Sequence, residues 1–106
     1  MQYTHSSRDD MRNMKKYILQ KFRYRELGEN FTKKMKKAEK ELANLPYGYK
    51  DTGFIYSGQV VYLKPSQSYL FFYIISEKEK IVTVVRVMQE RMNWKYILKN
   101  WLETNK

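Results

Sequence analysis

The sequence contains no cysteine, so neither a disulfide bond nor a thiolate-bound metal can hold the chain together. Its one histidine, His5, lies near the N-terminus, and the carboxylates do not cluster at the spacings of metal ligands. The four glycines are scattered, which argues against a glycine-rich phosphate loop. We therefore expect no metal and no cofactor, and neither metal-dependent nor classical nucleophilic catalysis.

Long apolar runs are also missing. The longest, residues 68–76, is too short to span a bilayer, and the N-terminus lacks the apolar segment of a secretory signal. We expect a cytoplasmic protein without membrane contact. The chain has 106 residues, 42% hydrophobic content and no recognisable linker, so residues 1–106 are predicted to form a single domain.

Acidic residues are few compared with basic ones. Eleven Asp and Glu residues face 21 Lys and Arg residues, which gives a net charge of +10. Such a field favours nucleic acid or a strongly acidic protein as partner, and charge alone does not choose between them. Five lysines would lie on the solvent side of a helix: Lys33, Lys34, Lys36, Lys37 and Lys40. They either form a solvated helix face without further role or provide an electrostatic surface for an acidic partner.

The chain does contain a clear strand pair in its second half. Two runs rich in β-branched and aromatic residues, Tyr69–Ser76 and Ile81–Met88, are joined by the charged connection Glu77–Lys80. This pattern predicts a β-hairpin. The second run ends in a polar corner around Arg91, which leads into a short helix. The apolar face of that helix would consist of Trp94, Ile97, Leu98, Trp101 and Leu102.

The first half of the chain predicts two helices. Residues 2–5 suit a short edge strand, after which Ser7 could cap a helix that starts with Asp9 and Asp10. Apolar stripes at helical spacing follow at Met11, Met14, Ile18 and Phe22 and, after a break at Leu27 and Gly28, at Phe31, Met35, Ala38, Leu42 and Leu45. Pro46 would end the second helix, because proline pushes the preceding residue away from helical angles.

These elements together predict an α+β fold. Residues 47–53 suit a loop, residues 54–64 a strand interrupted at Ser57 and Gly58, and residues 65–68 a turn. The two helices would form an antiparallel hairpin. We therefore expect a short N-terminal strand and a helical hairpin packed on one side of an antiparallel meander sheet, with a short C-terminal helix.

One charged residue stands inside the last strand. Arg86 lies between two valines, where an uncompensated charge is costly, so it must reach a carboxylate, a carbonyl or solvent. Either it pairs with Glu90 or with a carboxylate on a helix, or it forms a functional cationic corner with Arg91 at the strand end. Trp94 and Trp101 share one helical face and are expected to belong to the core.

Three segments carry a resemblance to a known family: VTVVRVMQERMNW at 82–94, SYLFFYII at 68–75 and YTHSSRDDMRNMKKYI at 3–18. Over nearly its whole length the chain resembles toxins of the RelE/ParE superfamily, from bacterial type II toxin-antitoxin modules. The resemblance implies a compact α+β domain that is neutralised by a cognate antitoxin in a hetero-oligomer. An acidic antitoxin segment that wraps over the toxin would suit a surface of this charge.

The superfamily divides between two activities. RelE-type toxins cut mRNA on the ribosome, and cleavage by the RNA 2′-hydroxyl needs groups that accept a proton, stabilise the phosphorane charge and protonate the leaving oxygen. The strand positions that correspond here hold Val60, Tyr62 and Leu70, which cannot do this work. The candidates that remain for a ribosome-dependent endonuclease are Lys64, Arg86, Arg91 and Tyr96.

Residues 69–73 and 90–93 instead resemble the ParE branch, whose members poison DNA gyrase without being nucleases themselves. The leading hypothesis is therefore a gyrase-binding toxin, and the alternative is an mRNA endonuclease. The expected target-binding residues are Arg86, Gln89, Glu90, Arg91, Asn93 and Trp94. The expected antitoxin-binding residues are Met11, Met14, Ile18, Phe22, Phe31, Met35, Leu98 and Trp101. A further possibility is a general nucleic-acid-binding module that uses the lysine face of the second helix.

Overall fold

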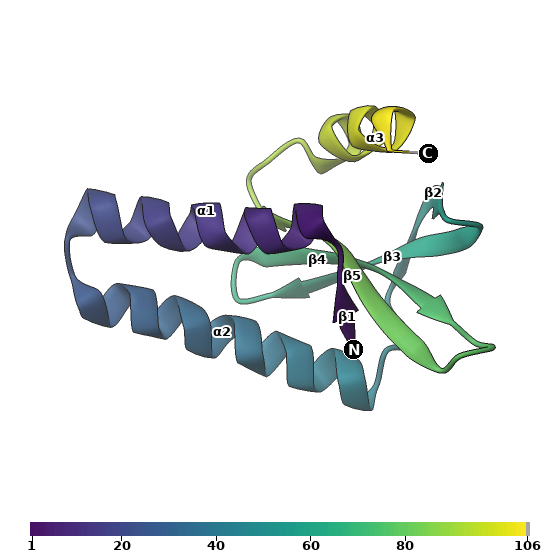
Figure 1. Ribbon diagram of the computed structural model, residues 1–106, viewed down its shortest axis with the longest axis horizontal. Helices are drawn as coiled ribbons and strands as arrows, with labels where there is room; N and C mark the ends of the chain where they lie inside the picture. Colours follow the sequence, from purple (N-terminus) through teal and green to yellow (C-terminus); the bar gives the residue numbers. More distant parts are fainter. Residues whose placement is uncertain (106) are drawn as a thin grey trace.

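The computed structural model describes residues 1–105 and has the predicted α+β architecture (Figure 1). Its elements, in chain order, are β1 (Gln2–Tyr3), α1 (His5–Phe22), α2 (Arg25–Asn44), β2 (Lys50–Tyr56), β3 (Gln59–Ser66), β4 (Tyr69–Ser76), β5 (Ile81–Gln89) and α3 (Trp94–Thr104). Within the described part of the chain, every helix is too short or too polar to cross a membrane.

The five strands form one mixed sheet in the order β1-β5-β4-β3-β2. The strands from β2 to β5 form the antiparallel meander that the sequence predicts. β1 differs, because it pairs in parallel with β5 through Gln2 opposite Thr83 and Tyr3 opposite Val84. This short pairing leaves most of the outer edge of β5 free for other contacts.

The middle of the chain contains one more strand than predicted. Ser57 and Gly58 both have positive φ, 54° and 77°, and form a tight turn between β2 and β3. Positive φ at both central residues is typical of the two-residue turn that closes a β-hairpin. The segment 54–64 is therefore two strands, β2 reaches back into the expected loop at 47–53, and the turn expected at 65–68 is confined to Gln67 and Ser68.

The helix ends also differ from the prediction. α1 begins at His5, where the Oγ1 of Thr4 accepts the Ser7 backbone N–H at 3.1 Å, so Thr4 and not Ser7 caps the helix. The break between the helices lies at Arg23, which has φ 53°, and not at Gly28. Gly28 lies inside α2, where a Cβ atom would meet the Leu19 side chain at 2.7 Å. The glycine therefore lets α1 and α2 pack closely.

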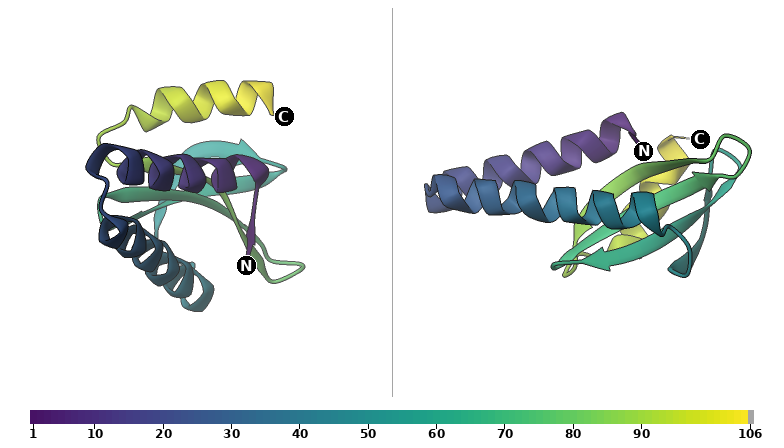
Figure 2. Two further views of the ribbon diagram at one scale, coloured as in Figure 1. Left: turned by 60° about the vertical axis from the view of Figure 1, so that its left-hand side comes forward. Right: turned by 90° about the horizontal axis from the view of Figure 1, so that it is seen from below.

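The core occupies both faces of the sheet. On one face, the helical hairpin packs Phe31, Met35, Ala38 and Leu42 against buried residues of β4 and β5. On the other face, Leu98 of α3 is buried over β3, β4 and β5 together with Val61, Leu63, Leu70, Phe72, Ile74, Val85 and Met88. The helical hairpin thus lies on one face as predicted. Figure 2 shows that α3 covers the other face, so the sheet is a middle layer.

Truncation of a side chain beneath α3 tests this layered core. Phe72 is fully buried, so Phe72→Ala should lower the free energy of unfolding by about 3–5 kcal/mol, measured by urea denaturation. Ile55 is 65% exposed on β2, and Ile55→Ala should change the same quantity by no more than about 0.5 kcal/mol. Equal effects of the two substitutions would contradict the core described above.

Candidate functional site

The last strand contains a bulge where the site begins. Val84 lies opposite Tyr73 and Arg86 lies opposite Phe72, so Val85 is an extra residue in β5. A bulge bends a strand and re-aims its side chains. Here Val85 packs in the core beneath α3, and the guanidinium carbon of Arg86 lies 5.5 Å from the centre of the Trp101 ring on α3. Both side chains therefore lie on the α3 side of the sheet.

Residues from the N-terminal segment close the free edge of β5 beyond β1. The Thr4 backbone N–H donates to the Val84 carbonyl at 3.0 Å, and the Thr4 hydroxyl donates to the Val85 carbonyl at 2.7 Å. One carboxylate oxygen of Asp10 accepts the Val87 backbone N–H at 2.9 Å. α1 thus supplies the partner that a neighbouring strand would otherwise provide.

Arg86 pairs with the same carboxylate. Its Nε donates to Asp10 Oδ2 at 2.7 Å and its Nη2 donates to Asp10 Oδ1 at 2.9 Å. The side chains are only 16% and 15% exposed, and two-point pairing of this kind is the strongest form of carboxylate binding by arginine. The sequence left open whether Arg86 pairs with Glu90 or with a carboxylate on a helix. In the structure Arg86 pairs with Asp10 of α1 and not with Glu90. The charge of Arg86 is therefore compensated within the fold.

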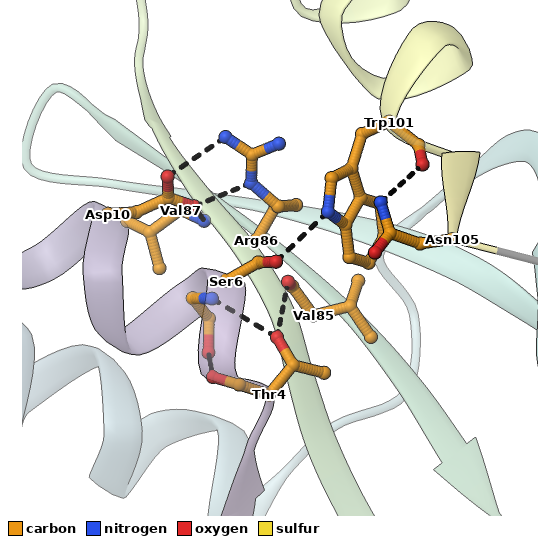
Figure 3. Close-up of polar contacts among 9 residues, drawn as sticks. Thr4, Ser6, Asp10, Val85, Arg86, Val87, Trp101 and Asn105 are labelled. Atoms are coloured by element: carbon orange, nitrogen blue, oxygen red, sulfur yellow. Dashed lines mark hydrogen bonds and ion pairs between the residues drawn. The ribbon is translucent and has the colours of Figure 1, made fainter. Parts of the chain in front are cut away.

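Trp101 joins α3 to this arrangement. Its indole N–H donates to the Ser6 hydroxyl at 3.0 Å, and its ring stacks on Tyr56 with a centroid distance of 5.1 Å. Figure 3 shows Arg86 between Asp10 on α1 and Trp101 on α3. Trp94, at the start of α3, packs against Phe72 at 5.4 Å. Both tryptophans are half-buried against the α3-side core, as expected for core residues.

The polar corner after β5, residues 89–93, is held by its backbone. The Glu90 N–H donates to the Ser68 carbonyl at 2.9 Å, and the Met92 N–H donates to the Gln89 carbonyl at 3.1 Å. The side chains of Glu90, Arg91, Met92 and Asn93 are exposed. Arg91 reaches back to its own segment, where its Nε donates to Gln89 Oε1 at 3.0 Å. The corner therefore presents polar side chains from a fixed backbone.

Two hollows border the corner, and a third shares Tyr69 with one of them. The first, of about 400 Å³, lies beside β4 and is lined by Ser68, Tyr69, Gln89, Glu90 and Arg91. The second, of about 350 Å³, lies between the corner and α1 and includes Asp10, Asn13, Met14, Tyr17, Arg86, Gln89, Arg91 and Met92. The third, of about 630 Å³, lies at the end of the helical hairpin and includes Ile18, Phe22, Leu27, Asn30, Phe31, Lys33, Lys34 and Tyr69. We call them the β4 hollow, the α1 hollow and the hairpin hollow.

The residues expected to bind an antitoxin divide into two groups. Met11, Met14 and Ile18 are half-buried along α1, and Phe22 is 47% exposed at its end. Phe31, Met35 and Leu98 are core residues with exposures of 4%, 8% and 0%. In this conformation the second group offers a partner almost no surface. Leu98 and Trp101 also lie on the α3 side of the sheet, where Trp101 contacts only the start of α1, at Ser6.

Of the residues considered for nuclease chemistry, the structure brings together Arg86 and Arg91 but not Lys64 and Tyr96. Lys64 is only 4% exposed, and its Nζ pairs with Glu41 Oε2 of α2 at 2.8 Å. This hydrogen bond lowers the pKa of the Glu41 carboxyl. Tyr96 is 65% exposed on α3, which covers the opposite face of the sheet. Arg91 lies at the corner and lines the α1 hollow together with Arg86, which is paired with Asp10.

Two residues of the α1 hollow region were not singled out from the sequence. Tyr17 and Lys21 lie one helical turn apart, and the Lys21 ammonium donates to the Tyr17 hydroxyl at 2.8 Å. The hydrogen bond from Lys21, followed by the charges of Lys21 and Arg91, lowers the pKa of Tyr17 below its usual value. Residues four apart lie side by side on a helix, so the contact between Tyr17 and Lys21 could have been predicted from the sequence. The proximity of Arg91 is not visible in the sequence.

A protein-family model described as "ParE toxin of type II toxin-antitoxin system, parDE" matches residues 1–94. The match covers β1 to β5, the helical hairpin and the corner, and it ends at the first residue of α3. No curated protein matches the sequence.

Removal of the Asp10 charge tests the closure of the β5 edge. Asp10→Asn leaves the Arg86 guanidinium unpaired in a largely buried place, so the free energy of unfolding should fall by about 2 kcal/mol or more. Asp9 is the matched control, because it is 37% exposed and pairs only with the exposed side chains of His5 and Arg12. Asp9→Asn should cost less than about 1 kcal/mol in the same urea titration. A larger loss for Asp9→Asn than for Asp10→Asn would refute the assigned role.

Proposed function

The chain belongs to the ParE toxins of type II toxin-antitoxin systems, and from this premise we propose that it arrests growth by binding and poisoning DNA gyrase. The contact surface would be the exposed corner after β5, with Gln89, Glu90, Arg91 and Asn93 in direct contact. Arg86 and Trp94, which the sequence also suggested, would support the corner from beneath. In this mechanism the toxin holds gyrase in the complex in which the DNA is cleaved, so gyrase and not the toxin breaks the DNA strand.

The observation that carries this proposal is the separation of the residues that the sequence suggested for proton transfer, Lys64 and Tyr96. Cleavage through an RNA 2′-hydroxyl requires a base and an acid on either side of one phosphate. Lys64 is bound to Glu41 beneath α2, while Tyr96 lies on the helix that covers the other face. The two side chains therefore lie on opposite sides of the sheet, and the Lys64 ammonium is already bound to a carboxylate. A docking function needs only the rigid, exposed corner.

An antitoxin partner follows from the family, and the hairpin hollow is the surface that we propose for it. Its floor is apolar, with Ile18, Phe22 and Tyr69, and Lys33 and Lys34 line the same hollow. An amphipathic helix or extended segment with acidic side chains would complement such a surface. Phe22, 47% exposed, is the most accessible apolar residue of the set predicted from the sequence.

The gyrase proposal can be tested with purified components. The protein, incubated with gyrase and supercoiled plasmid, should produce linear DNA after denaturation of gyrase. Arg91→Ala should reduce the yield about tenfold, because it removes a charge-assisted contact, while the free energy of unfolding changes by less than about 0.5 kcal/mol. Arg8 is exposed on α1 away from the corner, and gyrase incubated with Arg8→Ala should yield as much linear DNA as gyrase incubated with the unchanged protein.

The alternative function, mRNA cleavage on the ribosome, predicts a different experimental result. Toeprinting on translating ribosomes should reveal no cut in the A-site codon. Cuts in the A site, together with intact gyrase supercoiling at saturating protein, would overturn the gyrase proposal in favour of an mRNA endonuclease. Equal yields of linear DNA from Arg91→Ala and the unchanged protein would show that the corner is not the contact.

A further inference from the structure

Two cationic side chains, Lys21 and Arg91, lie near Tyr17, which lines the α1 hollow. The Lys21 ammonium lies 2.8 Å from the Tyr17 hydroxyl, 5.3 Å from the Tyr17 ring centroid and 5.6 Å from the Phe22 ring centroid. Arg91 comes from the corner and lines the same hollow as Tyr17. The three residues thus bring together α1 and the end of β5, which are far apart in the sequence. We call them the Tyr17 cluster.

The positive charge of this cluster is not compensated within the fold. Among residues 1–105, neither Lys21 nor Arg91 forms an ion pair. The one carboxylate that lines the hollow, Asp10, already binds Arg86 and the Val87 backbone N–H. The lowered pKa of Tyr17 reflects the two nearby cations. An anion bound in the hollow would form the ion pairs that Lys21 and Arg91 do not form within residues 1–105.

We infer that the Tyr17 cluster is a binding site for a carboxylate side chain of an acidic peptide. The guanidinium of Arg91 can bind both oxygens of a carboxylate, and the Lys21 ammonium and the Tyr17 hydroxyl add further donors. This inference rests on the proposed antitoxin contact and deepens it, because it names the chemical group that the toxin recognises.

The neighbouring surface favours a peptide over nucleic acid as the occupant. Tyr17 and Ile18 are adjacent on α1, and they line the α1 hollow and the hairpin hollow respectively. The hairpin hollow has apolar residues in its wall, Phe22 and Leu27 among them. A peptide can place apolar side chains in the hairpin hollow and a carboxylate at the Tyr17 cluster. A phosphate backbone offers only charge and would leave the apolar wall uncovered.

A carboxylate at this place would also explain neutralisation. Arg91 is the residue that we assign to the target contact, and its guanidinium cannot bind a partner carboxylate and contact gyrase at the same time. The acidic peptide would therefore mask the corner directly.

Binding of synthetic probes tests the inference without gyrase and without a natural partner. The probes are a short labelled peptide of leucine, alanine and glutamate, the same peptide with every glutamate replaced by glutamine, and an oligothymidylate of matched charge. Affinity is measured by fluorescence anisotropy at fixed ionic strength. We expect the glutamate peptide to bind more tightly than the glutamine peptide, and Lys21→Gln/Arg91→Gln to weaken its binding about tenfold.

Two variants sharpen the assignment. Tyr17→Phe keeps the ring but removes the hydroxyl, and it should weaken the glutamate peptide about threefold without affecting the glutamine peptide. Arg8→Gln/Lys99→Gln is the control of equal charge loss, because both residues are exposed away from the cluster. It should leave the preference for the glutamate peptide unchanged apart from a small general loss.

The opposite results would overturn the inference. If the cluster variants and the control weaken the glutamate peptide equally, binding is due to net charge alone. If Lys21→Gln/Arg91→Gln weakens only the oligothymidylate, the cluster is a phosphate site. A protein that binds the glutamate peptide as expected but forms no cleaved gyrase complex would refute the proposed target and leave the carboxylate site intact.

Discussion

Asp10 is the residue on which the rest of the structure depends, because it replaces a missing strand at the edge of β5. Its carboxylate binds both the Arg86 guanidinium and the Val87 backbone N–H, 76 and 77 positions away in the chain. Without it, a backbone donor and a largely buried charge would lack partners, and each such loss is expensive. Since Arg86 also lies over Trp101, this one contact fixes α1, the sheet and α3 relative to one another.

The same contact separates two arginines that look alike in the sequence. Arg86 is compensated and belongs to the scaffold, whereas Arg91 stands a few residues further on, exposed and without an ion pair in the described chain. The scaffold thereby holds the corner rigid while its charge remains available. α3 has a different role, since all of it except Trp94 lies outside the matched family region, yet it covers the sheet face that contains Phe72 and Val85.

Predictions from the sequence succeeded where a pattern of neighbouring residues is typical of one structure. They failed where the same residues suit two different structures. The apolar stripes placed both helices, and Pro46 correctly ended the second. Gly28 resembles a helix break, but its missing Cβ instead serves the approach of Leu19 from the other helix. Ser57 and Gly58 interrupt one strand in the sequence, and only the strand pairing shows that the chain reverses there.

The sequence by itself determined the α+β class, the meander, the excess of positive charge and the family, because periodicity, composition and motifs are properties of neighbouring residues. The tertiary structure decided which polar groups are compensated. Asp10 looked like a residue that favours a helix start, and Tyr17 and Lys21 looked like an ordinary helix surface. Arg86, which binds Asp10, and Arg91, which lines a hollow with Tyr17, come from the far end of the chain, and the distance between such groups is set only when the layers pack.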